Sequence, residues 1–225
     1  MAQLAQNYHS DLQQSQQNNL KLTDNPEEYT QKLTHALNEI PQTQKLQDPE
    51  HSELNWKVEE THVEKAIHLS KNNSATGLDG CPYELWKTLK TRHESAMKHN
   101  GKSFNITKVL TILFQDIQMH RVDHQTEFAI GWMCPIFKKK DPSDISNYRP
   151  ITLLNTDYKL LTKVLALQLM DTADTMVHPD QAGFIPKRSI FNQIRLAKEI
   201  INFAEATETN GTIIALDQEK AYDKI

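Results

Sequence analysis

The spacing of apolar residues changes along this chain, and that change is what most constrains the fold. Helical spacing recurs over the first half, two short apolar runs then flank a basic turn, helical spacing returns, and an apolar run, GTIIAL, follows at Gly211–Leu216. This order favours an α+β fold over a doubly wound sheet, in which strands and helices would alternate. Neither a GxGxxG motif nor a P-loop occurs, so nucleotide binding of those two types is not supported.

The individual elements follow from the same spacing and from the residues that interrupt it. Asn25-Pro26-Glu27-Glu28 is typical of a helix start, and Pro41 ends the helix that begins there. The segment Gln42–Ser52 is polar and contains Pro49, which indicates a linker. The predicted helices are a stretch around Leu4–Leu12, Tyr29–Ile40, Glu59–Lys71, Tyr83–Lys90, Ile106–Met119, Tyr158–Met176 and Asn192–Ala204, and the predicted strands are Ala129–Phe137, Ile151–Leu154, Gln181–Ile185 and Gly211–Leu216.

Composition excludes several classes of protein. The chain has 225 residues, of which 38% are hydrophobic, and the mean hydropathy is −0.63. Its longest apolar stretch, Tyr158–Met170, contains Lys159 and Lys163 and is shorter than the roughly 20 residues of a membrane span, so no membrane association is expected. The N-terminus has no basic segment followed by an apolar one, as a secretory signal would. Two isolated cysteines, Cys81 and Cys134, predict free thiols in an intracellular compartment.

The charge is unevenly placed. The net charge is −4, all of it contributed by residues 1–128, while residues 129–225 are neutral. Overall charge therefore does not indicate a nucleic-acid-binding protein, and any such role must depend on local clusters.

The clearest cluster is the basic turn between the two short apolar runs. Lys138, Lys139 and Lys140 precede it and Arg149 follows it, which predicts a cationic hairpin tip able to hold phosphates. Lys159, at the start of the next helix, could join them. The alternative is a solvated turn whose charge Asp141 and Asp144 partly neutralise.

Asp217 follows the apolar run GTIIAL directly. A carboxylate at the end of a buried strand lies at a sheet edge, where it can hold Mg²⁺ together with substrate phosphates. The alternative is that Asp217 caps the following helix, a common use of aspartate.

Two further segments stand out. The loop Gly77-Leu78-Asp79-Gly80 has two glycines that allow close backbone approach to a ligand, but a tight turn between helices explains them equally well. The pair Lys187-Arg188 is predicted to be exposed and by itself indicates no function.

Together these segments resemble the reverse transcriptases of LINE-type (non-LTR) retrotransposons. The resemblance covers about residues 57–225, and it depends on several motifs occurring in order at fitting distances. The matching segments are SATGLDGCPYELWK, CPIFKKKDPSDISNYRPITLLNTDYKLLTKVLALQL, HPDQAGFIPKRSIFNQI and GTIIALDQEKAYDKI, which are similar to that family's motifs 0, 1, 2 and A.

The resemblance implies an architecture and a set of roles. It implies a helical extension at residues 1–56 and a partial polymerase domain at 57–225, with fingers at 57–204 and the start of the palm at 205–225. Asp217 would be a catalytic, metal-binding aspartate, and Mg²⁺ the expected ion. The implied nucleotide-binding residues are Arg149, Lys159, Leu216, Gln218 and Tyr222. Of these, Tyr222 would exclude a ribose 2′-hydroxyl. The implied template-binding residues are Thr76, Gly77, Asp79, Gly80, Lys138, Lys139, Lys140, Gly183 and Phe184.

The implied partners are an RNA template, a DNA primer and deoxynucleoside triphosphates, while the oligomeric state stays open. The 225 residues contain neither the YxDD motif nor motif B or the thumb of the family. A fragment of an RNA-directed DNA polymerase that is inactive alone is therefore expected, with a non-catalytic RNA-binding remnant as the alternative. A metal-dependent nuclease that uses Asp217 ranks last, because it lacks further acids at workable spacing.

Overall fold

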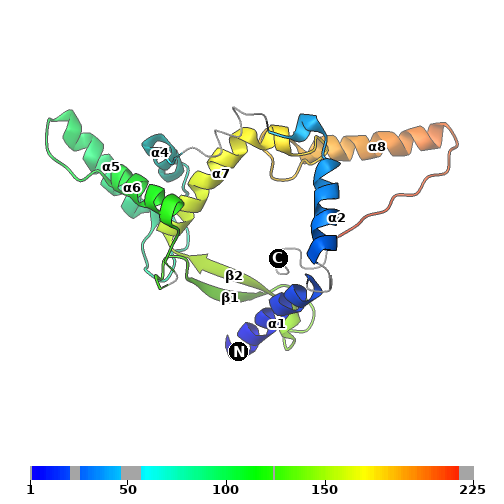
Figure 1. Ribbon diagram of the computed structural model, residues 1–225, viewed down its shortest axis with the longest axis horizontal. Coiled ribbons are helices and arrows are strands. Elements are labelled where there is room, and N and C mark those ends of the chain that lie inside the picture. Colours follow the sequence, from blue (N-terminus) through cyan, green and yellow to red (C-terminus); the bar gives the residue numbers. More distant parts are fainter. Residues whose placement is uncertain (1, 21–25, 47–56, 124, 218–225) are drawn as a thin grey trace. The chain divides into compact units, whose positions relative to one another are not determined.

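The computed structural model describes residues 2–20, 26–46, 57–123 and 125–217 (Figure 1). They contain both helices and a two-stranded antiparallel sheet, in agreement with the predicted α+β class. None of the helices in these ranges has the length and apolarity needed to cross a bilayer. The elements in chain order are α1 (Ala2–Leu20), α2 (Pro26–Asn38), the 3-10 turn η1 (Gln42–Gln44), α4 (Glu60–His68), α5 (Tyr83–Lys98), α6 (Ile106–His120), β1 (Gly131–Phe137), η2 (Ile145–Asn147), β2 (Tyr148–Leu154), α7 (Thr156–Met176) and α8 (Ile190–Ala206).

The chain divides into two compact units, Asp48–Asp171 and a second unit formed by the segments on either side of it. The core of the first unit is built by α4, α5, α6 and the first half of α7, whose labelled ribbons Figure 1 shows. Its members are spaced as amphipathic helices require, and burying them supplies the main stabilising free energy of the unit. The fully buried side chains of this core include Val58, Val63, Ile67, Phe114, Leu160 and Val164.

Local signals set most helix ends. The side chain of Asn105 accepts a hydrogen bond from the Lys108 amide and so caps α6, and Ser189 caps α8 in the same way through the Phe191 amide. Helix α5 runs further than the predicted Tyr83–Lys90, because residues after Lys90 remain compatible with a helix and Lys90 pairs with a glutamate one turn on.

The hairpin β1–β2 confirms the predicted pair of strands around the basic turn. Gly131 pairs with Leu154 at the open end and Phe137 pairs with Tyr148 at the closed end, next to the tip. A side chain at Gly131 would approach the Thr152 methyl to 2.4 Å, which explains why glycine opens this strand.

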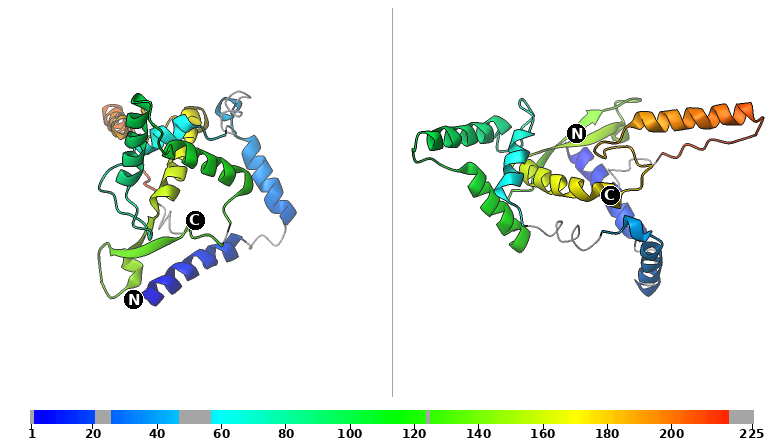
Figure 2. Two further views of the ribbon diagram at one scale, coloured as in Figure 1. Left: turned by 90° about the vertical axis from the view of Figure 1, so that its left-hand side faces the viewer. Right: turned by 90° about the horizontal axis from the view of Figure 1, so that it is seen from above.

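Two predicted strands are wrong. Residues Gln181–Ile185 form turns, and Phe184 has φ +63°, which interrupts an extended backbone. Residues Gly211–Leu216 follow α8 without regular structure, as the right-hand view in Figure 2 shows, and Leu216 is 93% exposed. A strand needs a neighbour with free backbone groups, and in the described part of the chain the only sheet consists of β1 and β2, neither of which pairs with residues 211–216.

Candidate nucleic-acid interface

The loop between α4 and α5 is fixed to the start of α7. Asn155 Oδ1 accepts a hydrogen bond from the Asp79 amide at 3.3 Å, and Thr156 Oγ1 donates to the Cys81 carbonyl at 2.9 Å. The fully buried Thr156 hydroxyl also accepts from the Trp86 indole N–H at 2.8 Å. These bonds attach a loop to a helix that follows it by more than 70 residues in the sequence.

Glycine is required at two points of this loop for different reasons. A Cβ on Gly77 would lie 2.2 Å from Asn155 Oδ1 and 2.4 Å from the Asn155 amide nitrogen, so the loop backbone packs directly on that residue. Gly80 has φ +67°, a conformation that side chains disfavour, and its amide donates to the Gly77 carbonyl at 3.2 Å. The geometry is therefore compatible with both interpretations of the motif, a tight turn between helices and a loop that a ligand can approach. The glycines build a tight turn, and this turn displays the partly exposed Thr76 and the exposed Asp79.

Lys159 binds the same loop rather than the hairpin tip. Its ammonium group donates to the Ala75 carbonyl at 2.8 Å and lies 5.5 Å from the centre of the Tyr83 ring. The expectation that Lys159 joins Lys138–Lys140 is thus not met, because the backbone of the loop offers its ammonium group a partner.

One carboxyl group and one thiol near this junction have shifted pKa values. Burial raises the pKa of Asp157, and the negative charge of Asp79 adds to the shift. Burial also raises the pKa of the Cys81 thiol, with a further contribution from Asp79. The thiol is consequently held neutral, and the chemistry of a cysteine nucleophile, which needs the thiolate, is not favoured here.

The hairpin tip presents its cations on a well-ordered turn. Asp141 accepts hydrogen bonds from the Ser143 amide and hydroxyl at 2.9 and 2.8 Å, and these bonds lower its pKa. Asn147 donates to the Asp141 carbonyl at 2.9 Å, which closes the turn from the other side. Lys138, Lys139 and Lys140 are exposed, and no carboxylate in the described ranges lies within ion-pairing distance of them. Arg149 is exposed on β2, opposite Ile136.

The turn before α8 is organised by Arg188, which the sequence predicts to be exposed and to which it assigns no function. Its guanidinium donates to the carbonyls of His178 at 2.6 Å, Val177 at 3.1 Å and Gln181 at 3.0 Å, and its side chain is only 16% exposed. Because Arg188 satisfies these carbonyls, the segment has no need of a sheet neighbour. No sequence signal marks this role, because the five donors of an arginine bind here to backbone carbonyls, which every residue has.

This turn displays two of the residues that the sequence singled out. Gly183 accepts a hydrogen bond from the Gln181 side chain at 3.3 Å, and Phe184 is 94% exposed. An exposed phenylalanine in a left-handed conformation is costly, and its ring is available for contact with a partner.

The residues implied at the metal site are not assembled into one. Asp217 is exposed and irregular, which corrects its expected place at the edge of a sheet, and Gln218 and Tyr222 lie outside the described residues. Among residues 2–20, 26–46, 57–123 and 125–217, no three acidic, histidine or cysteine side chains form a group that could hold a metal ion. A single carboxylate holds Mg²⁺ only together with other oxygen ligands, such as the phosphates of a substrate.

Comparison with known proteins is consistent with these motifs. Residues 137–225 match the family described as reverse transcriptase (RNA-dependent DNA polymerase). Over 167 residues the chain is 31% identical to the uncharacterized 149 kDa protein of transposon TX1 from Xenopus laevis. That match covers 72% of the chain but only 11% of the relative, so the chain spans about a ninth of that protein.

Proposed function

The chain belongs to the reverse transcriptase family of non-LTR retrotransposons, and we propose that it forms the template-holding part of an RNA-directed DNA polymerase. A reverse transcriptase domain acts on nucleic-acid templates and nucleotide substrates, and the family uses divalent metal ions. In the full-length protein, deoxynucleotides would be added to a DNA primer along an RNA template by a two-metal mechanism, with Mg²⁺ as the ion.

The observation that carries this proposal is the anchored loop between α4 and α5. Gly77 packs on Asn155, and the loop amides and carbonyls bind Asn155, Thr156 and Lys159. Segments that resemble two separate polymerase motifs are thereby held together in one compact unit. A ready-made arrangement of this kind favours binding, because little of the loop has to be ordered when a strand docks.

The proposed roles follow the exposed groups of each segment. In this proposal Thr76, Gly77, Asp79, Gly80, Lys138, Lys139, Lys140, Gly183 and Phe184 contact the template. Arg149 and Lys159 neutralise phosphates of the incoming nucleotide, Leu216 and Gln218 flank them, and Tyr222 excludes the ribose 2′-hydroxyl. The proposed domains are the extension 1–56, the fingers 57–204 and the start of the palm 205–225.

Asp217 is proposed to contribute one metal ligand of the full-length enzyme. A two-metal site needs several carboxylates, and in the described part of the chain Asp217 belongs to no group of three acidic, histidine or cysteine side chains that could hold an ion. The second candidate function is a non-catalytic RNA-binding protein, which the exposed Lys138, Lys139 and Lys140 of the hairpin tip favour.

Primer extension distinguishes the two functions. The 225-residue protein should bind an RNA template annealed to a DNA primer and should not extend the primer when Mg²⁺ and deoxynucleotides are added. Extension that disappears on Asp217→Ala would overturn the proposed inactivity of these residues. Absence of any binding to the primed template would overturn the template-holding role itself.

A further inference from the structure

Three lysines converge on the backbone that follows α4. The ammonium group of Lys163 donates to the Leu69 carbonyl at 3.1 Å and the Ser70 hydroxyl at 3.3 Å, and that of Lys87 donates to the Ser70 carbonyl at 2.6 Å. Lys159, already described at the Ala75 carbonyl, shares the Tyr83 ring with Lys163, whose nitrogen lies 5.9 Å from the ring centre. We refer to Lys87, Lys159 and Lys163 as the lysine cluster.

The lysine cluster makes no ion pair in the described structure, although the charge of Lys87 is among the causes that lower the pKa of Glu84. Carbonyl and hydroxyl oxygens satisfy the hydrogen-bonding of the ammonium groups but do not neutralise them. In the described ranges no carboxylate lies within 4.0 Å of any of these three nitrogens. Burial lowers the pKa of Lys163, and the charge of Lys87 lowers it further, because the two cations lie close together.

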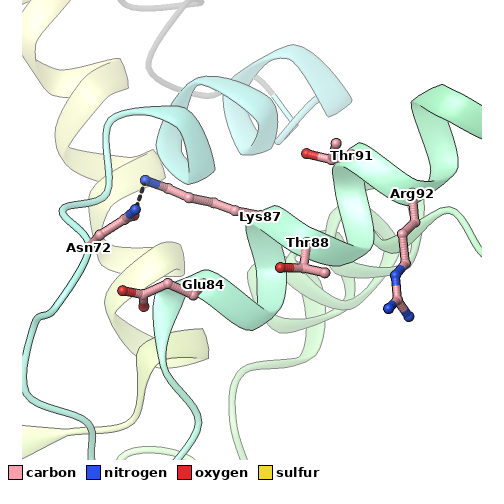
Figure 3. Close-up of a pocket in the computed structure, with 6 residues that line it drawn as sticks. All are labelled: Asn72, Glu84, Lys87, Thr88, Thr91 and Arg92. Atoms are coloured by element: carbon pink, nitrogen blue, oxygen red, sulfur yellow. Dashed lines mark hydrogen bonds between the residues drawn. The ribbon is translucent and has the colours of Figure 1, made fainter.

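Lys87 also belongs to a surface hollow of about 290 Å³ along α5 (Figure 3). Figure 3 shows Lys87 reaching Asn72 at one end of the hollow, while Arg92 extends from further along the helix. Arg92 is exposed and, in the described structure, makes no hydrogen bond or ion pair. The hollow is lined by Asn72, Glu84, Lys87, Thr88, Thr91 and Arg92.

The acidic member of the hollow, Glu84, binds the loop through one carboxylate oxygen, while its other oxygen, Oε2, is buried and has no hydrogen-bond partner in the described structure. Glu84 Oε1 accepts the Asn73 amide at 2.7 Å, and this bond lowers the pKa of its carboxyl group. The remaining lining groups are two cations, two hydroxyls and an amide, which are the side chains that contact phosphate oxygens in nucleic-acid complexes. Five residues of helix advance about 7.5 Å, so Lys87 and Arg92 would meet an extended strand at different points.

We propose that Lys163, Lys87 and Arg92 form a phosphate-binding track for the backbone of a single nucleic-acid strand, running from the lysine cluster along the α5 hollow. This inference rests on the proposed template-holding function and adds residues to which that function assigned no role. The phosphates of a bound strand would lie close to these positive side chains. Their negative charge would in turn reduce the repulsion between Lys87 and Lys163.

The salt dependence of binding tests this track, because each phosphate contact on a single strand contributes a slope of about −0.7 to log K against log salt. Fluorescence anisotropy is measured with labelled oligouridine and, separately, with oligothymidine. Lys87→Gln with Lys163→Gln should flatten the slope by about 1.4, so that the advantage of the wild-type chain falls about sevenfold between roughly 50 and 200 mM salt. Lys87→Arg with Lys163→Arg should retain the slope.

Two further variants keep the result interpretable. Arg92→Gln breaks no contact of the fold and should flatten the slope by about 0.7. Lys102→Gln with Lys108→Gln, at exposed positions outside the cluster and the hollow, makes the same change of charge as the double variant and should leave the slope within error.

The outcomes separate the inference from the function on which it rests. If the wild type binds and all these variants show its slope, the track is wrong and the template-holding function stands. If the control pair flattens the slope as much as the cluster pair, the effect is one of net charge and the track is again wrong. If the wild type binds neither oligonucleotide, the template-holding function fails as well. A loss with oligouridine but not with oligothymidine would support the track and assign it to RNA.

Discussion

At the scale of single residues, Gly77 has the tightest surroundings of the anchored loop. In Gly77→Ala the added methyl group would lie 2.2 to 2.6 Å from atoms of Asn155, two of which belong to the backbone and cannot move alone. Such overpacking typically costs about 1–3 kcal/mol of unfolding free energy. Urea denaturation should show this loss, whereas Gly211→Ala, where a Cβ would meet nothing within 4 Å, should change stability by less than about 0.5 kcal/mol. Equal stability of the two variants would contradict the close packing of the loop.

Asp157 makes stability depend on pH in a defined direction. Its pKa is higher in the folded protein than in the unfolded chain, because burial and Asp79 disfavour the charged form. The folded state therefore binds the proton more tightly, and the contribution of Asp157 is fully present at low pH and is lost as pH rises through its folded pKa.

Asp157→Asn removes this titration and keeps an oxygen that can accept the Tyr158 amide, which lies 2.7 Å from the carboxylate. The variant should match the wild type in acid and exceed it near neutral pH. Urea denaturation at several pH values measures the difference. A difference that is constant with pH would show that Asp157 does not titrate differently on folding.

At the scale of elements, the side chain of Arg188 stabilises the turn before α8. Arg188→Ala would leave the carbonyls of His178, Val177 and Gln181 without their donor, at a cost of about 1.5–3 kcal/mol because the donor is charged. We expect faster protease cleavage between residues 177 and 188. Lys187→Ala, at the exposed neighbour, should leave the cleavage rate unchanged, and equally fast cleavage in the two variants would contradict the role of Arg188.

The segment Gly211–Leu216 should limit solubility. Ile213 and Ile214 are 73% and 76% exposed, and a run of β-forming residues without a sheet neighbour can pair with another molecule. Ile214→Glu should reduce light scattering on concentration, whereas Thr212→Glu adds the same charge but leaves the apolar residues in place and should help less. A wild-type protein that stays monomeric and melts cooperatively at high concentration would count against this expectation.

Elements whose signals are local could be predicted from the sequence, and elements that depend on distant partners could not. The β1–β2 hairpin and the cap of α6 at Asn105 depend on nearby residues. The strand predicted at Gly211–Leu216 needs a neighbour that its own sequence does not specify. The same limit applies to the site. The glycines of the loop can be recognised in the sequence, but the hydrogen bond from Asp79 to Asn155 spans 76 positions. The hydrogen bonds of Arg188 are made to backbone carbonyls, which every residue has.

At the scale of the whole molecule, net charge conceals the surfaces that matter. The chain has a net charge of −4, yet the lysine cluster and the hairpin tip are both positive and both belong to the unit Asp48–Asp171. The same unit contains the whole hydrophobic core cluster from Val58 to Val164. All the buried members of this core cluster therefore come from the unit itself.

A fragment of residues 57–176, which keeps α7 entire, should consequently fold on its own. We expect cooperative thermal unfolding and a near-ultraviolet circular dichroism signal from Trp86, whose indole is held by Thr156. Trp86→Phe in the same fragment identifies the part of the signal that comes from this ring. Because the lysine cluster, the α5 hollow and the hairpin tip all lie within the fragment, it should also retain most of the salt-dependent affinity for a single strand. A fragment that folds but has lost that affinity would move the binding surface to the flanking segments, and one that melts without cooperativity would show that the core needs them.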